Sequence, residues 1–428
     1  MDKRTLENII QDQREELGLK KRQRFIHRDA ENQIDFQSPL AQVVIGVRRC
    51  GKSTLCFNAL NKNNIHFGYI NLDDERLVRL RGEDLNDILE ILYKVYGDIK
   101  TLFIDEIQNI PEWYLFVNRL LRRGMHLLIT GSNAKLLSGE LATHLTGRHH
   151  TIHLYPFSFR EYCAFKELDI ETRSTRSIAS LRGAFDEYMV QGGFPELLFI
   201  RDKRDYINNL TESIIKRDII QRFKIRYKTV FEKLTHNLLN ESPCLQSDKN
   251  LMDSFGLGSI HTVKNYVNYL QQAYLLLGLH KFSFKSRLRI GSEKVFPIDV
   301  ALMSNRENAF AGNNLGKRLE TIVYIELLRK YKPLGYDIYY FNERDFECDF
   351  VVCKGNTVKL AIQVSYDISD PKTYKREIKG LIETYKKTKA KSLLLLTDHE
   401  YAQIKVKDIP ISILPVYEYC LNRQDSIQ

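Results

Sequence analysis

The 428-residue chain is longer than one hydrophobic core usually supports, so two or three domains are expected. Hydrophobic residues make up 43% and charged residues 28%, and the formal net charge of +10 favours a polyanionic partner. The charged first ten residues argue against a secretory signal, and no apolar stretch approaches the roughly 20 residues of a membrane span.

The chain begins with a charged segment and then alternates two kinds of pattern. Residues 1–38 are expected to form a helical leader that ends near Ser38 and Pro39. Residues 39–155 alternate short apolar runs with helical patterns, which predicts a parallel sheet covered by helices. The expected strands are nearly continuously apolar, as strands buried on both faces are: QVVIGV, HFGYINL, KTLFIDE, HLLITGS and HTIHLY.

The first of these strands runs into a complete phosphate-loop motif, G-x-x-x-x-G-K-[ST], which a predicted helix follows. Its glycines let backbone N–H groups turn toward phosphate oxygens, and the helix adds its partial positive charge. Lys52 is expected to reach the β- and γ-phosphates of ATP, and Ser53 to ligate Mg²⁺. The residues expected to bind the nucleotide are Gly46, Val47, Arg48, Arg49, Cys50, Gly51, Lys52, Ser53 and Thr54.

Polar residues end two further core strands. Asp105 is expected to hold Mg²⁺, directly or through water, and Glu106 to polarise the attacking water. This pair predicts hydrolysis rather than binding alone, because a site that only binds ATP has no need of Glu106. The next strand ends in Thr130, Ser132 and Asn133, of which Ser132 or Asn133 is the candidate sensor of the γ-phosphate.

Arg148 lies in LTGRHH, just before the fifth strand. From there an arginine could reach the nucleotide of a neighbouring subunit and act in catalysis; the alternative is an ordinary surface arginine. Residues 156–228 follow as an expected all-helical lid, which a turn at QGGFPE interrupts.

Five motifs together resemble the archaeal-type AAA+ ATPases of prokaryotes: VIGVRRCGKSTL, LFIDEIQNIPEW, LLITGSNAKLLSGELATHLTGR, LYPFSFREY and GGFPE. More narrowly, they resemble the subfamily whose AAA+ core precedes a carboxy-terminal domain of uncharacterised function. The resemblance covers nearly the whole chain. It implies an additional-strand P-loop core, a helical lid containing GGFPE, and nucleotide sites shared between subunits of a homo-oligomer such as a ring.

Residues 229–300 carry a short helix, a turn, a helix over 259–276 and then a basic segment, an order that resembles a winged helix-turn-helix. Residues 201–300 hold 17 Lys and Arg against 10 Asp and Glu, which favours DNA. The segment is expected to be a protruding hairpin in which Phe282 and Phe284 alternate with cations that contact phosphates, although winged helices also dock proteins. The candidate DNA-binding residues are Lys264, Lys281, Lys285, Arg287 and Arg289.

Residues 301–428 read as a second α/β domain that resembles the PD-(D/E)XK nuclease fold, with Glu320 on a helix and Asp349 on a strand. In active members, an Asp and a following E-x-K hold Mg²⁺ and activate water. Here that position reads Gln363-Val364-Ser365, which lacks the second carboxylate and the lysine. Glu347 remains nearby and leaves weak metal binding open. The domain is therefore interpreted as a degenerate nuclease that binds nucleic acid or mediates assembly.

The expected fold class is α/β: a P-loop AAA+ core with a parallel sheet and a helical lid, then a winged helix-turn-helix, then a nuclease-like α/β domain. The expected function is Mg²⁺-dependent hydrolysis of ATP, coupled to the binding or remodelling of DNA by an oligomer. Seven irregularly spaced cysteines indicate reduced thiols, no zinc site and a cytoplasmic protein.

Two alternatives stay open. One is an ATP-controlled DNA nuclease. The other is a nucleotide-driven switch that binds DNA or protein without motor activity. NLDDERLVRLRGEDLND, between the second and third core strands, has no aromatic pore-loop signature, and this favours the switch over a motor.

Overall fold

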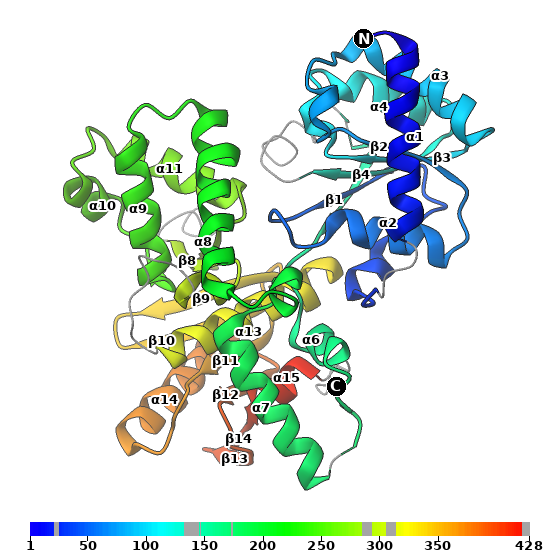
Figure 1. Cartoon of the computed structure of the whole chain (residues 1–428). Coiled ribbons are helices and arrows are strands. Elements are labelled where there is room, and N and C mark those ends of the chain that lie inside the picture. Colours follow the sequence, from blue (N-terminus) through cyan, green and yellow to red (C-terminus); the bar gives the residue numbers. More distant parts are fainter. Residues whose placement is uncertain are drawn as a thin grey trace. The chain divides into compact units, whose positions relative to one another are not determined.

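The computed structural model describes residues 1–20, 25–131, 145, 147–172, 174–284, 293–304 and 314–421. The chain divides into two compact units, Met1–Leu154 and Tyr155–Gln428 (Figure 1). None of the described helices is long and apolar enough to cross a membrane.

The first unit is built on a five-stranded parallel sheet in the order β2-β3-β4-β1-β5. Its strands are β1 (Ala41–Ile45), β2 (Phe67–Asn71), β3 (Thr101–Asp105), β4 (His126–Gly131) and β5 (His149–His153). The helices between them are α2 (Lys52–Lys62), α3 (Leu85–Tyr96) and α4 (Trp113–Arg122). Every residue of β1 and β3 is buried, which explains their apolar runs and confirms the predicted parallel sheet.

The helix at the start of the chain, α1 (Lys3–Lys20), packs beside α3 and β2 in this first unit. Gln13 binds the backbone of Asn71, at the end of edge strand β2. Its side-chain amide donates to the Asn71 carbonyl at 3.0 Å, and its side-chain oxygen accepts from the Asn71 amide at 2.9 Å. These bonds satisfy backbone groups at an open sheet edge. The helix buries one face, which consists of Leu6, Ile9, Ile10, Gln13 and Leu17.

The second unit begins with helices, as expected for residues after 155. They are α6 (Phe159–Phe165), α7 (Thr175–Gln191), α8 (Lys203–Ser213) and the π-helical Ile214–Gln221. Three more helices follow, α9 (Lys228–Glu241), α10 (Asp248–Phe255) and α11 (Ile260–Gln272). They accompany a small antiparallel sheet in the order β6 (Cys244–Leu245), β8 (Glu293–Pro297) and β7 (Leu276–His280).

The last part of the second unit contains a six-stranded mixed sheet in the order β13-β14-β12-β11-β10-β9. β11, β12 and β14 are parallel to one another, whereas β9, β10 and β13 pair antiparallel. This confirms a further α/β domain. The strands are β9 (Asp337–Glu343), β10 (Phe346–Lys354), β11 (Thr357–Val364), β12 (Ser392–Thr397), β13 (Ala402–Val406) and β14 (Ile409–Pro415). The helices are α12 (Ala301–Ser304), α13 (Leu315–Tyr331), α14 (Pro371–Thr388) and α15 (Val416–Leu421).

The start of the expected basic hairpin does not protrude. Lys281 forms a bridge with Tyr340 of β9, and the Phe282 amide donates to the Tyr340 carbonyl at 2.6 Å. The Phe282 ring is 1% exposed and packs against the rings of Tyr339 and Phe341. The expectation of a protruding ribbon is therefore wrong at this end, because the aromatic ring among the cations belongs to a hydrophobic core. The rest of the hairpin, with Lys285, Arg287 and Arg289, lies outside the described residues.

Candidate nucleotide-binding site

The phosphate loop connects β1 to α2 through a backbone turn that few residues adopt. Arg49 and Gly51 have positive φ angles of 63° and 96°. Gly51 accepts this conformation without a Cβ clash and precedes Lys52, the first residue of α2. The amino terminus of α2 thus lies at the loop, where it attracts anions. The other residues expected to bind nucleotide lie in this loop or in the first turn of α2: Gly46, Val47, Arg48, Cys50, Ser53 and Thr54.

The Lys52 side chain is folded back over the loop. Its ammonium donates to the carbonyl oxygens of Gly46 and Val47, each at 3.2 Å, and lies 3.9 Å from Glu106 Oε1. Lys52 is 4% exposed, so its charge is directed into the site rather than into solvent. An ammonium that donates only to neutral carbonyls can turn to phosphate oxygens when a nucleotide is bound.

Asp105 ends β3 beneath the loop and is buried. Its Oδ1 accepts hydrogen bonds from the Ser53 hydroxyl at 2.9 Å and from the Thr130 hydroxyl, and Oδ2 accepts from the Tyr69 hydroxyl at 3.4 Å. Burial and then the Glu106 carboxylate raise the pKa of Asp105, while the hydroxyls of Thr130 and Ser53 oppose that rise. The site thus holds a desolvated carboxylate that a cation would stabilise in its charged form.

These side chains fit a magnesium nucleotide. The Ser53 hydroxyl and the Asp105 carboxylate are hard oxygen ligands, and their oxygens lie within 2.9 Å of each other. Mg²⁺ is usually held by one or two such protein ligands together with phosphates and water. Lys52, at the start of α2, lies in the same site and supplies the positive charge that phosphates need.

Glu106 follows directly, in a strained left-handed conformation with φ 54° and ψ 47°. Its amide donates to Thr130 Oγ1 at 3.1 Å, and its carboxylate accepts from the Gln108 side-chain amide and faces Lys52. Since strain in a non-glycine residue persists only where surrounding contacts enforce it, this geometry is consistent with a functional role. The structure therefore brings Lys52, Ser53, Asp105 and Glu106 together, as the motifs predicted.

Two residues of this site were not assigned a role by the motif reasoning. Thr130 was named only as a polar strand end, yet its hydroxyl joins Asp105 to the Glu106 backbone. Arg28 donates to the carbonyl of Cys50 at 3.0 Å and so braces the loop. The sequence feature that could have pointed to Thr130 is its polar character at the end of a core strand. Arg28 belongs to no motif, so no sequence feature indicated its role. The preferred sensors, Ser132 and Asn133, lie outside the described residues.

Arg148 is exposed and far from its own phosphate loop along the sheet. β1 and β5 run parallel, with Ala41 paired to His149 and Ile45 to His153. The loop follows the carboxyl end of β1, whereas Arg148 precedes the amino end of β5. Arg148 therefore lies at the opposite edge of the sheet and does not join the cluster around Lys52.

Of the expected DNA-binding residues, the structure describes Lys264 and Lys281, and these two differ in their exposure to solvent. Lys264 lies on α11, where its side chain is 66% exposed and its ammonium is 3.9 Å from the Asp248 carboxylate. Lys281 is half-buried in the bridge beside β9. Within the described part of the chain, only Lys264 of this set keeps the open position that was expected.

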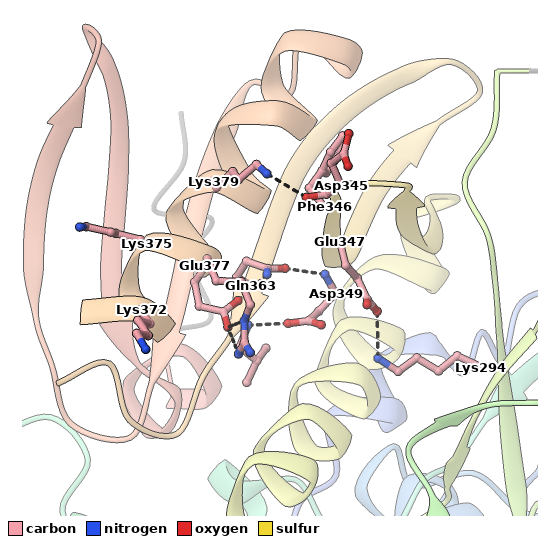
Figure 2. Close-up of a pocket in the computed structure, with 12 residues that line it drawn as sticks. Lys294, Asp345, Phe346, Glu347, Asp349, Gln363, Lys372, Lys375, Glu377 and Lys379 are labelled. Carbon is pink, nitrogen blue, oxygen red and sulfur yellow. Dashed lines mark hydrogen bonds and ion pairs between the residues drawn. The ribbon is translucent and has the colours of Figure 1, made fainter. Parts of the chain in front are cut away.

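Residues that resembled a nuclease site lie in and beside one pocket of about 760 Å³ (Figure 2). Asp349 and Gln363 line it from β10 and β11. Ser365 does not line it, and its hydroxyl donates to the Asp367 carbonyl at 3.0 Å. An unexpected residue, Lys294 of β8, lines the pocket and forms an ion pair of 2.5 Å with Glu320 of α13. No sequence spacing connects β8 with these residues.

The charged side chains at the inner end of this pocket shift one another's pKa values. Burial opposes the charge of Lys294, but the Glu320 and Asp349 carboxylates outweigh it and raise the pKa of this lysine. Burial raises the pKa of Glu320, although Lys294 opposes the rise, and burial and then Glu320 raise the pKa of Asp349. Among the described residues, no three His, Cys, Asp or Glu side chains are arranged to hold a metal ion. All seven cysteines are free thiols.

Comparison with known families covers most of the chain. Residues 38–163 match a family described as an AAA domain. Residues 182–312 and 315–417 match two domains of unknown function, DUF8612 and DUF4143.

Two curated proteins are similar along their length. The uncharacterized protein MJ1544 of Methanocaldococcus jannaschii is 33% identical over 437 residues, which cover 98% of this chain and 96% of that protein. An uncharacterized protein of Haemophilus influenzae is 27% identical over 387 residues, which cover 86% of this chain and 92% of that protein.

Among solved structures, the RuvB Holliday junction branch migration motor of Thermotoga maritima is 16% identical, with a TM-score of 0.27. The match covers 62% of this chain and 88% of that chain. A mutant of the same protein gives a TM-score of 0.28 at 16% identity, over 58% of this chain and 84% of that chain.

Proposed function

We propose that this chain, which belongs to the same family as the Methanocaldococcus jannaschii protein MJ1544, hydrolyses ATP with Mg²⁺ through its AAA domain. The observation that carries this proposal is the cluster of Lys52, Ser53, Asp105 and Glu106 beside the phosphate loop. A site for nucleotide binding alone would explain the first three residues. It would leave the strained Glu106, with its carboxylate directed at Lys52, without a purpose.

Each side chain has a distinct role in this reaction. The Lys52 ammonium leaves the two loop carbonyls and neutralises the β- and γ-phosphates. The Ser53 hydroxyl and the Asp105 carboxylate hold the cation, which supplies charge neutralisation at the phosphates when bound. The Glu106 carboxylate orients a water molecule and accepts its proton as the water oxygen bonds to the γ-phosphorus and the bond to the ADP oxygen breaks.

We further propose that the partner of this ATPase is DNA and that it binds through a winged helix. Support comes from the order of elements α9, β6, α10, α11, β7 and β8, in which two strands form an antiparallel hairpin after the third helix. Lys264 is exposed on that third helix. Residues 201–300 also hold 17 Lys and Arg against 10 Asp and Glu, and an excess of cations provides affinity for phosphates without sequence specificity.

The test is the steady-state ATPase rate of the full chain with Mg²⁺, measured alone and with single-stranded, duplex and branched DNA. Glu106→Gln is the blank, because loss of a general base typically lowers the rate by about 10²–10⁴-fold while nucleotide binding remains. We expect one form of DNA to stimulate the wild-type rate several-fold, and gel analysis afterwards to show that DNA intact.

The other outcomes separate the alternatives. ATP turnover that no DNA stimulates would reject the DNA-directed function and favour a nucleotide-driven switch with a protein partner. DNA cut in an ATP-dependent manner would support the nuclease. A Glu106→Gln variant that hydrolyses ATP at the wild-type rate would reject the assignment of the site itself.

A further inference from the structure

Carboxylates at the inner end of the carboxy-terminal pocket already have a cation of their own. The Lys294 ammonium lies 3.6 Å from Glu347 Oε1 (Figure 2). It also lies 2.5 Å from Glu320 Oε1, and Asp349 is close enough to act on its charge. The Lys294 side chain is 13% exposed. The ammonium therefore supplies at this position the positive charge that a metal ion bound to these carboxylates would bring.

Two further oxygens near this position accept backbone hydrogen bonds. Gln363 Oε1 accepts from the Asp349 amide at 2.7 Å, and the Gln363 side-chain amide donates to the Glu377 carboxylate. Asp349 Oδ2 accepts from the Val364 amide at 2.8 Å. Gln363 thus bridges β10 and α14 instead of offering its oxygen to a ligand. A divalent cation would have to displace Lys294 and break part of this network.

Helix α14 adds cations to the lining of the pocket, where Asp345 is also present (Figure 2). Lys372, Lys375 and Lys379 follow the spacing of one helix face, and all three line the pocket. Within the described residues, neither Lys372 nor Lys375 forms an ion pair with a carboxylate. Lys379 donates to a carbonyl, that of Asp345, at 3.1 Å. Arg376, by contrast, is paired with Glu377 at 2.6 Å.

We propose that this pocket is a nucleic-acid contact that binds backbone phosphates without a divalent metal, with Lys294 as its built-in cation. Lys294 offsets one unit of the negative charge that the inner carboxylates would otherwise direct at a phosphate, and the lysines of α14 make the phosphate contacts. This inference rests on the proposed DNA partner and locates part of its binding away from the expected winged-helix cations. It also gives a physical reason why the pocket would hold DNA without cutting it, since metal-assisted attack on the phosphodiester has no place for its metal.

The first test measures DNA affinity of the full chain by fluorescence anisotropy over a range of salt concentrations, in EDTA and in Mg²⁺. The double variant Lys372→Ala/Lys375→Ala is compared with Lys386→Ala/Lys387→Ala, which removes the same charge from α14 outside the pocket. We expect binding about tenfold weaker for the pocket pair and a salt slope lower by about two, because each lysine neutralises one phosphate. The control pair should change affinity less than twofold, and EDTA should change nothing. Circular dichroism and thermal unfolding report that each variant is folded.

The second test uses Lys294→Met, which keeps the length of the side chain and removes its charge. In nucleotide-free full chain, titration of Mn²⁺ followed by electron paramagnetic resonance of the free ion counts the bound ions. We expect Lys294→Met chains to take up more Mn²⁺ than wild-type chains, because the carboxylates that Lys294 neutralises then become available, and one or two carboxylates with water suffice for weak binding of such an ion. Lys294→Gln provides a second variant should Lys294→Met fail to fold.

Each result has a definite consequence. Equal DNA affinity of the pocket pair and the control pair, with DNA binding otherwise intact, overturns the pocket contact alone. A wild-type chain that binds no DNA overturns this inference and the proposed DNA partner together, while leaving the ATPase in place. DNA binding that requires Mg²⁺, or equal Mn²⁺ uptake by Lys294→Met and wild type, overturns the role of Lys294.

Discussion

At the scale of single residues, the Thr130 hydroxyl joins the two acidic residues of the nucleotide site. It donates to Asp105 Oδ1 and accepts from the Glu106 amide at 3.1 Å, and Thr130 is fully buried. Thr130→Val keeps the shape of the side chain and leaves the half-buried Glu106 amide without this partner, which costs about 1–3 kcal/mol. We expect kcat to fall by about tenfold to a hundredfold with little change in KM, measured by steady-state ATPase assays.

Two further variants make this prediction specific. Thr130→Ser retains the hydroxyl and should keep kcat within about threefold of wild type. Tyr69→Phe is the matched control, because its hydroxyl reaches the same Asp105 carboxylate through a longer bond of 3.4 Å, and it should lower kcat less than Thr130→Val does. If the kcat of Thr130→Val equals that of wild type, the hydrogen bonds of the Thr130 hydroxyl do not contribute to catalysis and this prediction is wrong.

At the scale of elements, the turn after α7 is fixed by a residue that follows β8. The Gly193 amide donates to Asp299 Oδ2 at 2.9 Å, and the Ala301 amide donates to Oδ1 at 2.8 Å. A Cβ on Gly193 would meet the Phe157 carbonyl oxygen at 2.2 Å, so the GGFPE turn needs glycine there. Burial raises the pKa of Asp299 to about 6, although both amides oppose the rise.

This raised pKa predicts how stability changes with pH. Because Asp299 titrates near 6 in the folded chain and near 3.8 when unfolded, its stabilising contribution is complete below about pH 4. That contribution is lost as the pH rises through 6, by roughly 3 kcal/mol. Asp299→Asn cannot titrate and accepts only one of the two amide bonds. The free energy of unfolding of Asp299→Asn, measured from urea unfolding curves, should therefore be lower than that of wild type at pH 4.5. The difference between the two free energies should be smaller at pH 7. A difference in free energy of unfolding that stays constant with pH would contradict the raised pKa of Asp299.

At the scale of the whole molecule, a catalytic role of Arg148 would require a second subunit. It precedes β5 at the sheet edge opposite its own phosphate loop, so it can assist catalysis only in a neighbouring copy. We predict that Arg148→Ala lowers the ATPase rate by roughly 10³-fold, whereas Arg123→Ala, an exposed arginine of the same unit, does not.

Mixing inactive variants tests the shared site directly. Arg148→Ala chains keep an intact Glu106, and Glu106→Gln chains keep an intact Arg148. A mixture should regain ATPase activity that neither variant has alone, because some sites then receive both groups. Mixtures that stay inactive, although native mass spectrometry shows mixed oligomers, would assign Arg148 to the ordinary surface.

The sequence by itself determined the features that depend on local order. Alternating apolar runs and helical patterns predicted the five parallel strands of the first unit, because burial on both faces leaves a continuous apolar run. The phosphate loop and the pair Asp105 and Glu106 were predictable because each consists of consecutive residues at the end of a strand. Consecutive residues lie next to one another however the rest of the chain packs. These features predicted the candidate nucleotide site.

Only the tertiary structure decided which distant residues meet. Nothing in the sequence links Lys294 of β8 to Glu320 and Glu347, or Phe282 to the core beside β9, because each pairing joins elements whose spacing follows no repeat. The motif reasoning therefore missed a lysine in the carboxy-terminal pocket and expected a protruding ribbon where an aromatic ring is buried. Side chains from separate elements meet according to how those elements pack, and packing depends on the burial of the whole chain rather than on local order.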